Sequence, residues 1–105
     1  MDAINKIKSQ IKENSIVLYM KGTPTKPSCG FSSKASEILL KCKKKFLYVD
    51  VLENPDIRSA LPEFSNWPTF PQLWINETLI GGCSIIVKMF ESGELQKLIN
   101  NTDKQ

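Results

Sequence analysis

A loop rich in glycine and proline, residues 21–32, separates two segments of different periodicity. Residues 15–20 before it form a continuous apolar run of β-forming residues, which is typical of a buried inner strand. After the loop, apolar residues recur at helical spacing to about residue 43, and residues 46–51 form a second strand-like run. A strand, a crossover helix and a second strand in this order predict two parallel strands of one sheet.

Two segments flank this unit with helical signals of their own. Residues 2–13 carry isoleucines at spacings of three and four, the stripe of an amphipathic packing helix. Asn54 and Pro55 mark the start of another helix, because Asn is a common N-cap and Pro suits the first helical position. Pro62 is expected to end or kink that helix.

The C-terminal part of the chain predicts two more helices. Gly81 and Gly82 break a strand, and Ser84 is the expected N-cap of the helix that follows and ends at Gly93. A short helix around residues 95–99 comes next, and the tail from residue 100 to 105 is expected to fray.

Between these helices, residues 67–75 lead into a third strand. Asn76 and Glu77 form a tight turn into residues 78–80, which predicts a β-hairpin whose turn type the residues leave open. The whole order predicts an α/β fold with a four-stranded mixed sheet and helices on both faces. Residues 1–105 are long enough for one domain with a single core, without disulfides.

Several classes of protein are excluded by what the sequence lacks. It has no histidine, which removes Ser-His and Cys-His catalytic pairs and any His-ligated metal. A net charge of +3 is too small and too scattered for nucleic-acid binding, and no run has the length of a membrane span. Three cysteines at irregular spacings do not resemble a secreted disulfide framework. We expect a reducing compartment: the cytoplasm, or an organelle if a targeting segment has been removed.

Cys29 lies where the helix after the loop should begin. The positive end of a helix dipole favours the thiolate, and such settings lower a thiol pKa from about 8.5 to roughly 3.5–7.5. Ser32 stands three residues later, so the motif is C-x-x-S and Cys29 has no local partner for a disulfide. Cys29 therefore needs a second sulfur from outside the loop. Cys42 lies on the apolar stripe of the predicted helix and is expected in the core.

Four lysines gather at the end of that helix. Lys41, Lys43, Lys44 and Lys45 have two interpretations. They form either a site for an anionic partner or, as we favour, a solvated helix C-terminus whose positive charge suits the dipole.

Three interruptions of the regular pattern lie at strand ends, where open α/β sheets place ligands: the Cys29 loop, the turn Thr69-Phe70-Pro71 and the pair Gly81-Gly82. A cis peptide bond before Pro71 would turn the backbone of Phe70 outward, toward an extended peptide. Because only about 5–6% of X-Pro bonds are cis, the residues alone favour trans.

A short peptide with two carboxylates and a thiol between them would satisfy all three interruptions. The glycine pair permits close approach, and the N–H groups of Cys83 and Ser84 would bind one carboxylate at a helix N-terminus. Lys21 and Arg58 would hold the second carboxylate, Arg58 in bidentate fashion. Glutathione is such a peptide. Taken singly, each element is more simply explained as structural: a turn proline, a loop glycine pair, a surface Lys and a surface Arg.

Over nearly its whole length the chain resembles the monothiol glutaredoxins. The loop with its Cys29-Gly30-Phe31-Ser32 core looks like their active-site signature. The run from Asn66 to Leu73 and the corner Gly81-Gly82-Cys83 are two further family marks, in the same order and spacing. Three separated motifs that agree make the resemblance specific.

The resemblance implies a thioredoxin-like fold with a cis bond before Pro71. It further implies that glutathione is held by the residues Lys21, Arg58, Thr69, Phe70, Pro71, Gly82, Cys83 and Ser84. Cys29 would ligate a [2Fe–2S] cluster shared by two protomers, each supplying its cysteine and one glutathione thiolate. The partners implied are glutathione, a second protomer when the cluster is bound, and acceptor iron–sulfur proteins, whereas the apo protein would be a monomer.

The chain departs from the family at Ser84, where Asp is usual. Ser84 lacks a charge that would pair with the ammonium group of glutathione, so weaker binding is expected. Cys83 is either a resolving thiol that pairs with Cys29 or, as we favour, a residue whose backbone lines the ligand. A cluster carrier is favoured over the alternative, a glutathione-dependent oxidoreductase acting through Cys29, because the longer loop before Cys29 resembles that of members with poor general disulfide reductase activity.

Overall fold

The computed structural model describes residues 2–102 of the chain. Its elements follow one another in the order predicted from the sequence. They are α1 (Ala3–Glu13), β1 (Ile16–Met20), α2 (Gly30–Lys41), β2 (Leu47–Asp50), α3 (Pro55–Ser65), β3 (Gln72–Ile75), β4 (Thr78–Gly81), α4 (Cys83–Ser92) and α5 (Glu94–Asn100).

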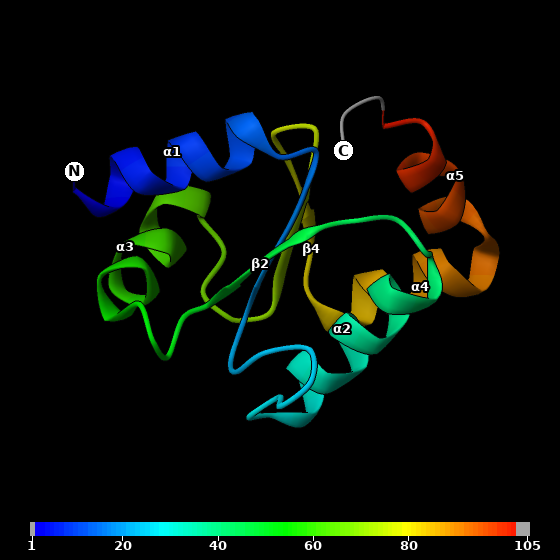
Figure 1. Ribbon diagram of the computed structural model, residues 1–105, viewed down its shortest axis with the longest axis horizontal. Coiled ribbons are helices and arrows are strands. Elements are labelled where there is room, and N and C mark those ends of the chain that lie inside the picture. The colour runs from blue at the N-terminus through cyan, green and yellow to red at the C-terminus, as the bar shows by residue number, and fades with distance from the viewer. Residues whose placement is uncertain (1, 103–105) are drawn as a thin grey trace.

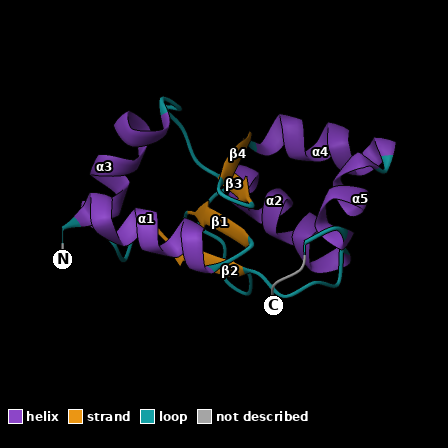
Figure 2. Cartoon of the chain, turned by 90° about the horizontal axis from the view of Figure 1, so that it is seen from above, coloured by secondary structure: helices purple, strands orange, loops and turns teal. Residues whose placement is uncertain are grey.

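Four strands form one mixed sheet in the order β2-β1-β3-β4. The pair β1–β2 is parallel, as predicted, and the pairs β1–β3 and β3–β4 are antiparallel. Figure 2 shows this order from edge to edge, with α1 and α3 on one side and α2, α4 and α5 on the other. The same division is visible in Figure 1, which confirms helices on both faces of the sheet. No described helix is long and apolar enough to cross a membrane.

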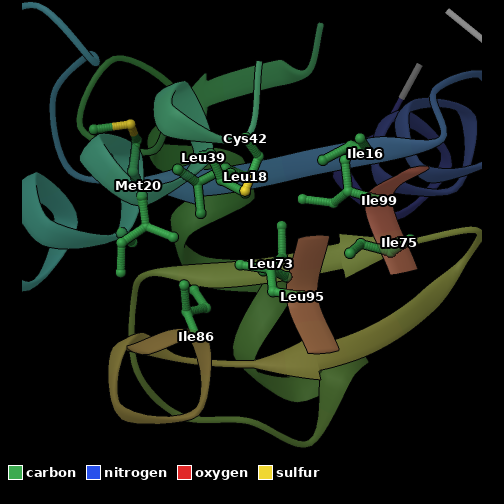
Figure 3. Packing of buried hydrophobic residues seen from close by; sticks show 12 residues of the cluster. Ile16, Leu18, Met20, Leu39, Cys42, Leu73, Ile75, Ile86, Leu95 and Ile99 are labelled. Atoms are coloured by element: carbon green, nitrogen blue, oxygen red, sulfur yellow. The ribbon is translucent and has the colours of Figure 1, made fainter. Parts of the chain in front are cut away.

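Alternate side chains of the strands serve two separate cores. On one face, β1 and β3 pack against α2, α4 and α5 (Figure 3), and this first core consists of Ile16, Leu18, Met20, Ala35, Ile38, Leu39, Cys42, Leu73, Ile75, Ile86, Leu95 and Ile99. On the other face, the sheet packs against α1 and α3, and the second core consists of Ile7, Ile11, Val17, Tyr19, Val49, Val51, Ile57, Leu61 and Trp74. Cys42 is buried in the first core, as expected.

Three local predictions need correction. Pro62 does not end its helix, which was one of the two outcomes expected there, because α3 continues to Ser65. Burial of Leu61 in the second core, and the ring of Phe64 against that of Trp74 at 6.1 Å between centroids, hold its last turn in place. The helix ends only at Asn66, a left-handed residue with φ of 55°.

The other two errors lie near the C-terminus. Helix α4 begins at Cys83 with Gly82 as its N-cap, so Ser84 is inside the first turn and is not the cap. The expected fraying does not apply to the part of the tail up to residue 102. Thr102 is buried, and its hydroxyl donates to the carbonyl of Ile99 at 2.8 Å. Residues 103–105 lie outside the described residues.

The turn between β3 and β4, which the sequence left open, is of the mirror-image type. Asn76 has φ of 50° and Glu77 has φ of 65°, so both central residues are left-handed. This is the backbone of a type I′ turn, which matches the twist of the two strands it joins. The hairpin prediction is confirmed.

Candidate functional site

The loop before Cys29 folds into a small closed hairpin. The N–H of Ser28 donates to the carbonyl of Lys21 at 2.9 Å, and Thr23 and Lys26 exchange backbone hydrogen bonds at 3.0 and 3.2 Å. Gly22 has φ of +89°, and a Cβ built there would lie 2.5 Å from the carbonyl oxygen of Lys26. A glycine is therefore required at this position, both for the backbone conformation and for space.

Two side chains tie this hairpin to the rest of the fold. Ser32 Oγ, in the first turn of α2, accepts the N–H of Lys21 at 3.0 Å. Asp50 Oδ1, at the end of β2, accepts the N–H of Gly22 at 2.9 Å. The end of β1, the loop and the start of α2 are thereby held in one arrangement around Cys29.

Cys29 is the N-cap of α2, and its Sγ accepts the N–H of Ser32 at 3.3 Å. Partial burial on its own would raise the pKa of the thiol. Hydrogen bonds from the hydroxyl and N–H of Ser32 and the N–H of Phe31, together with the charge of Lys21, outweigh that effect. The pKa of Cys29 consequently lies below its usual value, as predicted for a thiol at a helix N-terminus.

Ser32 is fully buried, so this position serves as an anchor of the loop. Its hydroxyl is committed to Lys21 and to Cys29. The C-x-x-S motif thus places a structural hydroxyl where a C-x-x-C motif would have a second thiol.

The loop before Cys29 and the start of α2 form the first wall of the site, through Lys21 and Phe31. A second wall is built around a cis peptide bond between Phe70 and Pro71. The cis bond implied by the resemblance is therefore present, although the residues alone favoured trans. Gln72, fully buried, fastens the preceding loop: its Nε2 donates to the carbonyls of Trp67 at 2.9 Å and Thr69 at 3.4 Å. Its Oε1 accepts the indole N–H of Trp74 at 3.2 Å, which fixes the orientation of the amide.

The third wall is the junction of β4 and α4. Gly82 caps the helix and makes no side-chain hydrogen bond to the first N–H groups of α4. A Cβ on Gly82 would lie 3.3 Å from the carbonyl oxygen of Pro71 and 3.4 Å from Nε1 of Trp67. A side chain at this corner would therefore require the second wall to shift slightly. The buried Nε1 of Trp67 has no hydrogen-bond partner within residues 2–102.

These walls enclose a groove of about 740 Å³. Its lining includes all eight residues predicted to hold the ligand, namely Lys21, Arg58, Thr69, Phe70, Pro71, Gly82, Cys83 and Ser84. Cys29 is not itself part of the lining, but it interacts electrostatically with two lining residues, Lys21 and Cys83. Cys29 therefore lies at the rim of the groove. The roles of these residues toward glutathione stay a prediction.

Four lining residues were not predicted as part of the site: Phe31, Pro62, Trp67 and Pro68. Phe31 is 69% exposed, an unusual state for a large apolar side chain. Its place two residues after Cys29 was the available signal. No signal in the sequence marked Pro62, because it was expected to end or kink its helix. It lies instead inside α3, which continues past it.

The two other cysteines differ from Cys29 in their electrostatics. Burial raises the pKa of Cys42. Burial and the nearby Cys29 raise the pKa of Cys83, against the opposing charge of Lys34. All three thiols are free, and a disulfide between Cys29 and Cys83 stays an open alternative.

The chain alone offers few ligands for a metal. Residues 2–102 contain no group of three or more His, Cys, Asp or Glu side chains that could hold a metal ion. A four-sulfur cluster fits this site only if Cys29 supplies one thiolate and the others come from outside the chain.

Comparison with known proteins points in one direction. The sequence model of the Glutaredoxin family matches residues 16–80. A protein of Haemophilus ducreyi described as Glutaredoxin 4 is 61% identical over 102 residues, covering 97% of this chain and 95% of that protein. Glutaredoxin 4 of Escherichia coli is 58% identical over 99 residues, with coverages of 94% and 86%.

Solved structures agree with the sequence relatives. The solution structure of a monomeric truncated mutant of Trypanosoma brucei 1-C-Grx1 superimposes with a TM-score of 0.87 at 37% identity, covering 96% of this chain and 91% of that one. The reduced apo form of poplar GrxS14 matches with a TM-score of 0.79 at 41% identity, with coverages of 92% and 89%.

Proposed function

The chain belongs to the glutaredoxin family, and we propose that it is a monothiol member that binds glutathione and carries a [2Fe–2S] cluster. The observation that carries this proposal is the pairing of Cys29, a single thiol of lowered pKa, with the groove beside it. Ser32, three residues after Cys29, carries a hydroxyl where a local disulfide partner would need a thiol.

The groove suits glutathione in charge and in shape. Lys21 and Arg58 provide positive charge along one side for a carboxylate, and the cis bond presents the backbone of Phe70 to the peptide. The uncapped start of α4 suits the second carboxylate. In this pose the thiol of glutathione points to the rim of the groove, where Cys29 lies.

The cluster is cargo that needs four sulfur ligands. One chain provides Cys29 and, through its bound glutathione, a second thiolate. Two protomers together provide four, so the loaded protein is a homodimer and the empty protein a monomer. Release of the cluster to an acceptor iron–sulfur protein would separate the protomers again.

Anaerobic reconstitution with iron, sulfide and glutathione tests the proposal. We expect visible absorbance in the wild-type protein and in Cys42→Ala, whose thiol is buried in the first core. We expect none in Cys29→Ser or when glutathione is omitted. Absence of the absorbance in the wild-type protein, or its persistence in Cys29→Ser, would contradict the proposal.

The lowered pKa of Cys29 also favours a second function, reduction of protein–glutathione mixed disulfides. The Cys29 thiolate would attack the sulfur of the bound glutathione, form a Cys29–glutathione disulfide and release the protein thiolate. A second glutathione thiolate would then attack that disulfide, release oxidised glutathione and restore Cys29. Steady-state turnover of a glutathionylated peptide tests this role, and a rate no higher than that of Cys29→Ser would exclude it.

A further inference from the structure

The peptide group between Lys21 and Gly22 is hydrogen-bonded at both ends. Its carbonyl, on Lys21, accepts the N–H of Ser28 at 2.9 Å. Its N–H, on Gly22, donates to Oδ1 of Asp50 at 2.9 Å. The two partners come from different parts of the chain, because Ser28 directly precedes Cys29 and Asp50 ends β2. One peptide group thus joins the loop that carries the thiol to the neighbouring strand.

Asp50 is held by the sheet itself. It pairs with Met20 in the parallel ladder of β1 and β2, and the N–H of Val51 donates to the carbonyl of Met20 at 2.9 Å. Pairing with β1 therefore continues past the end of β2 and fixes the backbone from which the Asp50 side chain extends. Asp50 does not line the groove beside Cys29, so any effect it has on a ligand passes through other residues.

Gly22 does not by itself select the orientation of this peptide group. Its φ is +89°, and glycine adopts positive and negative φ with similar ease. If the peptide turned over, the carbonyl of Lys21 would face the carboxylate of Asp50, and the N–H of Ser28 would lose its acceptor. Gly22 is also buried, so its N–H has little access to water as a substitute for Asp50. The side chain of Asp50 therefore selects the observed orientation.

We propose that Asp50 is a positioning residue of the site. By accepting the N–H of Gly22 it fixes the 21–22 peptide, which keeps Lys21 beside the groove and Cys29 at its rim. This role deepens the proposed function and rests on it for the identity of the ligand, glutathione. Asp50 acts on glutathione through Lys21 and the loop, and not by contact.

Three variants separate the hydrogen bond from the charge. Asp50→Leu removes both the acceptor and the charge. Asp50→Asn keeps an oxygen that can accept the N–H of Gly22 and removes only the charge. Glu53→Leu removes an exposed carboxylate in the turn after β2 and leaves the bond to Gly22 in place. Oδ1 of Asp50 also accepts the N–H of Leu52 at 2.9 Å, so the amides of Gly22 and Leu52 are followed separately.

Amide hydrogen exchange of the protein without glutathione reports on the loop directly. In the wild-type protein and in Asp50→Asn, we expect the amides of Gly22 and Ser28 to be protected. In Asp50→Leu the amide of Ser28 should exchange about tenfold faster, which corresponds to the loss of one hydrogen bond. The amides of Leu18 in β1 and Leu39 in α2 should keep their protection, which shows that the rest of the fold is intact.

Calorimetric titration with glutathione measures the consequence for the ligand. Asp50→Leu should weaken binding about fivefold, as much as Lys21→Gln, which removes one exposed ion pair. The double variant should bind no more weakly than either single variant, whereas independent effects would multiply to about 25-fold. Asp50→Asn and Glu53→Leu should bind glutathione as the wild-type protein does.

Four results would overturn the role of Asp50. One is wild-type protection of Ser28 together with wild-type affinity in Asp50→Leu. Two others are a loss in Asp50→Asn, or in Glu53→Leu, equal to that in Asp50→Leu, because charge and not the acceptor would then be the cause. The fourth is a multiplied loss in the double variant, which would mean that Asp50 does not act through Lys21.

Two further results are decided by exchange alone. If Asp50→Leu does not fold, a Gly22 amide in the wild-type protein that is protected like those of β1 supports the role, and one that exchanges as fast as that of the exposed Thr25 overturns it. If the wild-type protein does not bind glutathione, the proposed function fails. The exchange of Ser28 in Asp50→Leu then still decides whether Asp50 positions the loop.

Discussion

Single residues decide the chemistry at the rim of the groove. Cys29 and Cys83 lie close enough to affect each other, yet their pKa values move in opposite directions. The difference comes from the helix start: Ser32 and Phe31 direct donors at Cys29, whereas Cys83 receives burial and the repulsion of a neighbouring thiolate. One thiol is thereby activated and the other is kept protonated.

This difference predicts the order of alkylation. The rate at which iodoacetamide modifies each cysteine follows its thiolate fraction and its access. Cys29 should react first, with a rate that rises with pH around a midpoint below that of a free thiol, about 8.5. Cys83 should react more slowly, and buried Cys42 slowest. Mass spectrometry of peptides resolves the three. A midpoint for Cys29 at or above that of a free thiol would show that the donors do not act as described.

Replacement of Ser84 tests the role expected for a charge at this position of the groove. Ser84→Asp restores a negative charge beside the first turn of α4, so glutathione should bind more tightly, by up to about fivefold for an exposed pair at low salt. Ser84→Asn is the uncharged control. Calorimetric titration measures both, and an affinity for Ser84→Asp equal to that of the wild-type protein contradicts the expected role of the charge.

Lys43 offers a prediction about stability. It occupies the left-handed position after α2, where a non-glycine residue costs about 1–2 kcal/mol. Lys43→Gly should therefore raise the free energy of unfolding by about 1 kcal/mol. Lys41→Gly, the same change at the last residue of the helix, should lower it by up to about 1 kcal/mol. Urea unfolding measures both, and a loss of stability in Lys43→Gly would refute the assignment of strain to this residue.

At the scale of elements, the loop between α3 and β3 is shaped by groups that lie outside the lining of the groove. Gln72 joins Trp74 in the second core to the carbonyls of Trp67 and Thr69, so the sheet holds the wall that carries Phe70. Because Gln72 is buried, its amide has no access to water as a substitute partner.

Removal of this amide should therefore act twice. Gln72→Leu leaves the Trp74 indole N–H and one or two carbonyls unpaired, which should lower the free energy of unfolding by about 1–3 kcal/mol. It should also weaken glutathione binding, since the wall at Phe70 loses its support. Thr78→Val, on the exposed turn side of β4, is the control and should change neither quantity. Normal glutathione affinity in Gln72→Leu, measured at a temperature where it is fully folded, would mean that Gln72 does not position this wall.

The elements show which parts of this fold can be predicted from sequence. Apolar patterning, together with cap and turn residues such as Asn54 and Pro55, predicted all nine described elements, and the glycine and proline interruptions marked the three walls of the groove. The prediction failed where packing outweighed a local preference. Burial of Leu61 and the contact of Phe64 with Trp74 carry α3 past Pro62.

The same reasoning explains the error at Ser84. Its residue type suits an N-cap, but Gly82, at the corner beside Pro71 and Trp67, takes the cap position of α4. The position of Cys29 at the rim of the groove, outside its lining, depends on the closed hairpin of residues 22–27, which no periodicity describes.

For the whole molecule, the arrangement of two cores around one sheet determines where chemistry and contact can occur. The cores bind the helices to both faces and leave the ends of β1 and β3, with the start of α4, around the groove beside Cys29. The outer edge of β2 is a separate exposed surface.

The central claim is that a cluster is held by two copies of Cys29 and two glutathione thiolates. Native mass spectrometry of the anaerobically reconstituted protein weighs this assembly directly. We predict one species containing two chains, one [2Fe–2S] cluster and two glutathione molecules, which dissociates to apo monomers when the cluster is removed. A cluster on a single chain, or on a dimer without glutathione, would contradict the account.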